Sequence, residues 1–170
     1  MNERSIIAMH KTEKTAAEAS TGPHHFQMEG WISCAPFERL LNITIVSASE
    51  GRATLRMPFL IDYAQGGGLM HGGALVSLAD TAVVMAIKSL IPPESHFATI
   101  VLETKFLLPV KNGMVTAQAE VVEREGRILK GRATLYDEQK RAVLEFSSTF
   151  KIAADSRVRG ITFTASCDTT

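Results

Sequence analysis

Asp80 is the residue that most needs a chemical explanation in this chain of 170 amino acids. It lies near the middle of Ala74–Leu90, where Ser77, Thr81 and Lys88 are among the few polar residues. A run that is apolar on nearly every side is typical of a buried helix, and this one contains a carboxylate and barely reaches membrane-spanning length. A buried carboxylate needs a partner or a chemical task. It can act as a nucleophile or a general base, or be a structural aspartate bonded to a strand or helix end.

A glycine-rich turn, Gly66–Gly73, leads directly into this helix. The N–H of Gly72 stands at a helix start, where it has no intrahelical acceptor and lies at the positive end of the helix dipole. Such an N–H can polarise a carbonyl and hold the oxyanion that forms on attack. The alternative is that Gly72 and Gly73 only permit a tight turn. At about 1.5 Å per residue, Asp80 stands roughly 12 Å further along the helix, so one carbonyl can meet both groups only if they come from two subunits.

His71 precedes the helix, and we expect its ring to fix the turn through hydrogen bonds rather than to act as a base. The remaining histidines, His10, His24, His25 and His96, form no HxxxH or HxH spacing with it. The sequence therefore predicts no metal site.

The pattern around the central helix predicts an antiparallel sheet. Pro36 and the spacing of Phe37, Leu40 and Leu41 indicate a short helix near residue 36. Period-two alternation then predicts strands at 43–49, 52–59, 98–107, 114–123, 128–136 and 142–152. Because the connections between neighbouring strands are short, those strands should be antiparallel. The fold class is therefore α+β, with a curved antiparallel sheet wrapped around one long central helix.

The chain divides into one domain with an extension at each end. Residues 1–30 are largely polar and are expected to be a flexible N-terminal extension. Residues 31–153 form the domain, and residues 154–170, where the strand pattern fades, are expected to be a tail.

Composition narrows the function classes. With 18 basic and 18 acidic residues and no basic stripe, the chain is not expected to bind nucleic acid. Cys34 and Cys167 are isolated, which favours a reducing compartment, and the N-terminus lacks the apolar core of a signal peptide. We therefore expect a soluble cytoplasmic protein without a membrane partner. No GxSxG elbow occurs, and His71 stands where a GxGxxG motif starting at Gly66 would need glycine.

The segment from Gly68 through His71-Gly72-Gly73 to Asp80 resembles the signature of the hotdog-fold acyl-CoA thioesterases. The phenylacetic acid degradation (PaaI-like) branch is the most similar type: a glycine, two residues, HGG, then a carboxylate seven positions on. Phe106–Gly113 also resembles a strand-and-turn segment of that family, and the likeness covers about residues 31–153.

The resemblance implies a hotdog fold and hydrolysis of an acyl-CoA to the free acid and CoA. It implies that the Gly72 N–H holds the thioester oxygen and that Asp80 of a second protomer attacks or activates water. The assembly would be a homodimer or a dimer of dimers. Gly68, His71 and Gly73 would complete the substrate-binding turn. No cofactor is implied, because a thioester is already activated.

Two further residues match the family only approximately. Gln65 stands where relatives often have an asparagine that orients the attacking water, and it is one methylene longer. Thr99 stands where some relatives have a serine hydroxyl near the carboxylate, although a β-branched residue also suits a strand by packing alone.

Two other functions remain open from the sequence. One is a hydratase-type hotdog enzyme, and the other is a non-catalytic protein that binds acyl-CoA. The acyl group could be aryl or medium-chain, and any of Lys111, Arg124, Arg127 and Arg132 could meet the phosphates of CoA.

Overall fold

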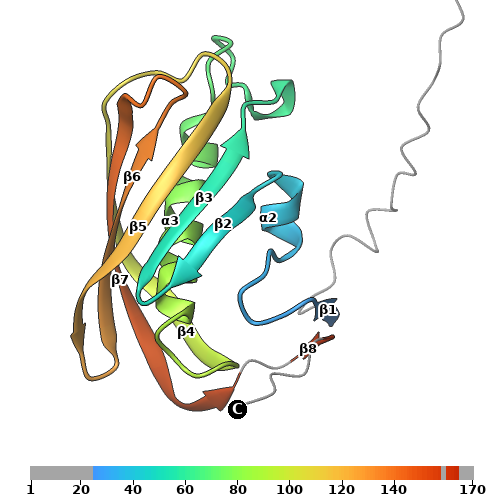
Figure 1. Ribbon diagram of the computed structural model, residues 1–170, viewed down its shortest axis with the longest axis vertical. Coiled ribbons are helices and arrows are strands. Elements are labelled where there is room, and N and C mark those ends of the chain that lie inside the picture. Colours follow the sequence, from blue (N-terminus) through green and yellow to red (C-terminus); the bar gives the residue numbers. More distant parts are fainter. Residues whose placement is uncertain (1–24, 158–159, 165–170) are drawn as a thin grey trace, which may run out of the picture.

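The computed structural model describes residues 25–157 and 160–164 of the chain (Figure 1). The first 24 residues of the predicted extension, 1–30, lie outside this range, as do residues 158–159 and 165–170 of the predicted tail. The elements in chain order are β1 (Phe26–Met28), α2 (Pro36–Leu40), β2 (Thr44–Ser49), β3 (Arg52–Pro58), the 3₁₀ turn η1 (Ile61–Tyr63), α3 (Gly72–Lys88), β4 (Ser95–Phe106), β5 (Met114–Glu125), β6 (Ile128–Tyr136), β7 (Ala142–Arg157) and β8 (Ile161–Phe163).

Six strands form one antiparallel sheet in the order β2-β3-β5-β6-β7-β4. The β2–β3 hairpin shows how local sequence fixes this pairing. Its two-residue turn, Glu50-Gly51, has positive φ at both positions, 49° and 75°, which matches the right-handed twist of the flanking strands. Strands β2 and β4 are the two edges of the sheet.

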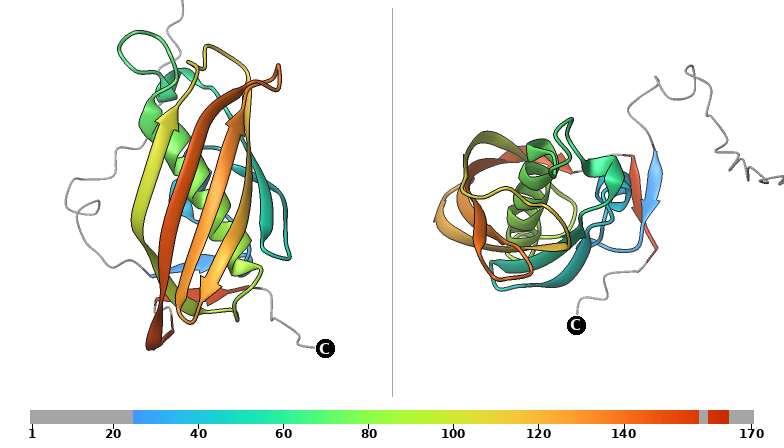
Figure 2. Two further views of the ribbon diagram at one scale, coloured as in Figure 1. Left: turned by 90° about the vertical axis from the view of Figure 1, so that its left-hand side faces the viewer. Right: turned by 90° about the horizontal axis from the view of Figure 1, so that it is seen from above.

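Helix α3 lies across the concave face of this sheet, as the two views of Figure 2 show. Leu55 and Met57 of β3 and Leu78 of α3 are fully buried between them. Burying one such side chain stabilises the fold by about 1.5–3 kcal/mol. The predicted arrangement, a curved antiparallel sheet around one long helix, is therefore confirmed.

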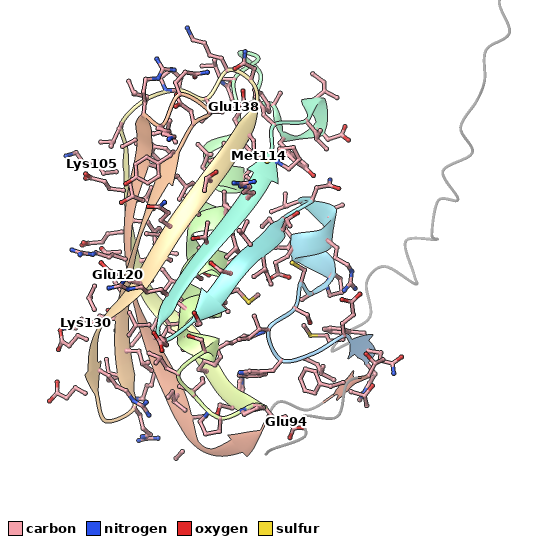
Figure 3. The ribbon with its side chains drawn as sticks, in the orientation of Figure 1. Glu94, Lys105, Met114, Glu120, Lys130 and Glu138 are labelled. Carbon is pink, nitrogen blue, oxygen red and sulfur yellow. The ribbon has the colours of Figure 1, made fainter. Side chains whose placement is uncertain are left out.

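The outer face of the sheet is polar and charged. Figure 3 shows Lys105, Glu120 and Lys130 on this side, pointing away from the helix. Glu120 and Lys130 alternate along their strands with buried residues such as Ala119 and Leu129, as an antiparallel sheet with one covered face requires.

The two ends of the described chain also form structure that the sequence analysis did not predict. Strand β1, within the expected extension, pairs in parallel with β8, within the expected tail. Strand β7 also continues to Arg157, beyond its predicted end. Three-residue strands show no apolar periodicity, so only the three-dimensional structure reveals their pairing. We call β1 and β8 together the terminal strap.

No helix in the described parts of the chain is long and apolar enough to cross a membrane.

Candidate active site

Asp80 and Thr99 meet between the central helix and the edge of the sheet. Thr99 lies on β4 at a register shift in its pairing with β7, on the side of the sheet that faces α3. Its hydroxyl donates to both carboxylate oxygens of Asp80, at 3.1 Å to Oδ1 and 3.4 Å to Oδ2. The two predicted residues are therefore in contact within one protomer.

Burial raises the pKa of Asp80 above its ordinary value, and the Thr99 hydrogen bond opposes that shift. Both effects follow from ordinary electrostatics: desolvation disfavours the charged form, whereas a donor aimed at the carboxylate favours it. Thr99 is its only hydrogen-bonding partner in the described chain, and no cation pairs with it there. A carboxylate with a raised pKa and incomplete pairing is typical of an acid–base or nucleophilic group.

The start of α3 presents one backbone N–H that is not used by the turn. His71 is the N-cap, and its Nδ1 accepts from the N–H of Gly73 at 2.9 Å. The carbonyl of His71 accepts from Ala74 at 3.0 Å. The N–H of Gly72 has no acceptor in the described structure, so it is the donor at this helix end that a ligand could take.

Phe106 is a neighbour of Gly72 that the sequence analysis did not single out. A Cβ added to Gly72 would lie 3.0 Å from Cζ of this ring, so the ring packs directly over the glycine. The side chain of Phe106 is nevertheless 56% exposed. Because the contact joins the end of β4 to the start of α3, no local pattern in the sequence could have predicted it.

Gln65 and Gly68 belong to the glycine turn before the helix. The side-chain Oε1 of Gln65 accepts from the N–H of Gly67, and its backbone oxygen accepts from the N–H of Gly68 at 2.8 Å. Gly68 has a φ of 78°, a conformation that favours glycine. Within the described protomer Gln65 forms no hydrogen bond with Asp80 or Thr99, and its amide oxygen holds the turn.

The predicted site residues thus fall into two groups within one chain. Asp80 and Thr99 form one, and the turn from Gln65 to Gly73 forms the other. About two turns of α3 separate Gly72 from Asp80, roughly 12 Å along the axis.

A hollow of about 1000 Å³ lies on the outer face of the sheet, and it contains none of these residues. Its charged side chains are largely paired with each other: Arg132 Nε donates to Glu120 at 2.7 Å, and Lys105 lies 3.8 Å from Glu145. We therefore place the candidate site on the helix side of the sheet. In the described residues, no three His, Cys, Asp or Glu side chains are grouped so as to hold a metal ion.

Comparison with known proteins identifies the family. The thioesterase superfamily model matches residues 67–144, which include most of the glycine turn, all of α3 and the Asp80–Thr99 pair. A Bacillus subtilis protein, ComA2, which is named provisionally as an esterase, is 33% identical over 104 residues. That match covers 61% of this chain and 82% of ComA2. The chain belongs to the thioesterase superfamily.

Other relatives match over a smaller part of their length. A provisionally named esterase of Halobacterium salinarum is 34% identical over 87 residues, 48% of this chain and 57% of that protein. A relative from Saccharolobus solfataricus is 23% identical, and the matched part covers 64% of its length. The chain thus spans less than two thirds of both relatives.

Solved structures show the same fold in this superfamily. The Escherichia coli PaaI protein of the phenylacetic acid degradation operon is 26% identical, with a TM-score of 0.67, over 75% of this chain and 88% of that one. A thioesterase family protein from Silicibacter pomeroyi is also 26% identical, with a TM-score of 0.67, over 71% and 91% of the two chains. The fold of this superfamily member is the hotdog fold, and the likeness to PaaI agrees with the branch predicted from the signature.

Proposed function

We propose that this thioesterase superfamily member hydrolyses acyl-CoA thioesters. The observation that carries the proposal is the half-buried carboxylate of Asp80, whose pKa burial raises and whose hydrogen-bonding partner among the described residues is Thr99. Such a group can deprotonate water or attack a carbonyl carbon near neutral pH. The names of the curated relatives support an esterase in general, and the acyl-CoA substrate is the finer part of the proposal.

Two routes fit a carboxylate at this position. As a general base, Asp80 takes a proton from water while the water oxygen bonds to the thioester carbon. As a nucleophile, it bonds to the thioester carbon itself, the C–S bond breaks to leave a mixed anhydride, and water then cleaves the anhydride to the free acid and the Asp80 carboxylate. In both routes the carbonyl becomes an oxyanion, which the free N–H of Gly72 would stabilise. The C–S bond then breaks, and the sulfur leaves as the CoA thiol once it has gained a proton.

The distance along α3 requires two subunits in this scheme. A carbonyl held by Gly72 would be attacked by the partner subunit's Asp80, so the protein would act as a homodimer or a dimer of dimers. The edge strand β4 supports this assembly, because an exposed apolar run on this strand follows directly after Thr99. Ile100, Val101 and Leu102 are 53%, 54% and 46% exposed, and an uncovered edge of this kind is a ready surface for pairing with a second chain.

Release of free thiol from a panel of acyl-CoA esters tests the activity. We expect wild type to turn over at least one ester and Asp80→Asn to lose on the order of a hundredfold or more in kcat, because the amide keeps the shape but cannot supply a charged oxygen. Circular dichroism of both proteins checks that the variant is folded.

The outcome that contradicts the proposal is binding without turnover. If wild type binds the esters but releases no thiol from any of them, the chain is an acyl-CoA-binding protein. If it adds water to an enoyl-CoA instead, it is a hydratase of the same fold.

A further inference from the structure

A second cavity, of about 230 Å³, lies beside the candidate catalytic pair and reaches it at Thr99. Thr99, which donates to Asp80, is one of its lining residues. Val84 and Lys88 also line it, and they follow Asp80 at positions i+4 and i+8, on the same face of α3. The cavity therefore extends from Thr99, the hydrogen-bonding partner of the carboxylate, toward the C-terminal end of the helix and away from Gly72.

Aromatic rings make up much of the cavity wall. Trp31 lies edge-on to Phe97 and to Phe163, with ring centroids 6.4 and 6.3 Å apart. The ammonium of Lys88 lies 4.9 Å from the centroid of the Trp31 ring, and Trp31 Nε1 donates to the Lys88 carbonyl at 3.0 Å. Lys88, the cationic side chain among the described lining residues, is thus held against the aromatic wall. An apolar ligand suits such a cavity.

The terminal strap, whose strands β1 and β8 are labelled in Figure 1, supplies one side of the cavity wall. Met28 of β1 and Ile161 and Phe163 of β8 line it. Both strands lie outside residues 67–144, the part that matches the superfamily. This wall is therefore built from the chain's own terminal segments and not from the shared core.

We propose that this cavity receives the acyl group of the substrate, and that the terminal strap with Trp31 forms its end wall and limits the length of the group. The inference rests on the proposed thioester hydrolysis, because it uses Asp80 to place the reacting carbonyl at the cavity mouth. A cavity of about 150 Å³ lined by aliphatic and aromatic residues holds benzene. The present volume suits a compact apolar acyl group, of about one ring and a few further carbon atoms.

Chain-length selectivity tests this assignment. The probes are straight-chain CoA esters from butanoyl to palmitoyl, and the measured quantity is kcat/KM for each. In Phe163→Ala the lost ring opens the end wall, so the ratio of kcat/KM for a long ester to that for a short one should rise at least about tenfold. This follows because each further buried CH₂ favours binding by about fourfold. Val84→Phe narrows the same cavity and should shift the ratio in the opposite direction.

Ile61→Ala is the matched control, since Ile61 lies in η1 and is 85% exposed, away from the cavity. Its selectivity should equal that of wild type. If wild type hydrolyses the esters but neither Phe163→Ala nor Val84→Phe changes the ratio, the strap does not form the end wall and the inference is wrong while the proposed function stands. If wild type hydrolyses none of them, the proposed function fails and this inference falls with it.

Discussion

At the scale of single residues, the function of the Thr99 hydroxyl can be separated from its packing. Its hydrogen bond favours the charged form of Asp80 and lowers a pKa that burial raises. Thr99→Val removes the donor and keeps the shape, so the pKa of Asp80 should rise further. Because the reaction needs the charged carboxylate, the acid limb of the pH profile of kcat/KM should move to higher pH. Steady-state rates across the acid range measure this shift.

Thr99→Ser provides the comparison, because it keeps a hydroxyl at the same position and should leave the acid limb close to that of wild type. A Thr99→Val profile that coincides with wild type would mean that the hydroxyl does not control the ionisation of Asp80. Thr99 would then be a packing residue, which is the alternative that a β-branched strand residue suggests.

At the scale of elements, the contact between α3 and β6 depends on a glycine in the strand. A Cβ on Gly131 would collide with Cγ1 of Val83, so the missing side chain is what lets the helix lie this close to the sheet. Gly131→Ala should therefore reduce the free energy of unfolding by about 1–3 kcal/mol through overpacking. Denaturant titration at fixed protein concentration measures the loss.

The companion variant Val83→Ala creates the space that the new methyl group needs. The double variant should be less destabilised than the sum of the two single variants, because the two changes compensate within one contact. Additive losses would show that contact with Val83 is not what excludes a side chain at position 131.

Whether the sequence predicts a feature depends on how far apart along the chain its interacting residues lie. Period-two alternation predicted β6 with its observed bounds, and the apolar run Ala74–Leu90 predicted α3, because both patterns act over neighbouring residues. The Asp80–Thr99 contact was predicted only through the resemblance. The terminal strap, the ring of Phe106 over Gly72 and the aromatic cavity were missed, since each joins segments far apart in the chain and leaves no periodic signal.

At the scale of the whole molecule, the site divided between Gly72 and Asp80 predicts how mixed assemblies behave. Proline suits the first position of a helix, and the extended ψ of His71, 131°, suits a residue before proline. Gly72→Pro should thus remove the donor N–H without breaking α3. Gly72→Ala keeps the N–H and adds the same Cβ beside Phe106.

We expect Gly72→Pro and Asp80→Asn each to lose on the order of a hundredfold in kcat when assembled alone, and Gly72→Ala to lose far less.

Equal amounts of the two inactive chains, Gly72→Pro and Asp80→Asn, unfolded together and reassembled, should regain about a quarter of wild-type activity. Half of the randomly formed pairs are mixed. In each mixed pair, one of the two shared sites joins an intact Gly72 to an intact Asp80 and the other site has neither, so half of the pairs have half of the activity. If both groups acted within one chain, every site in the mixture would lack one of them and no activity would return. Thiol release from the reassembled mixture, set against each variant treated alone, therefore decides whether the active site belongs to one protomer or to two.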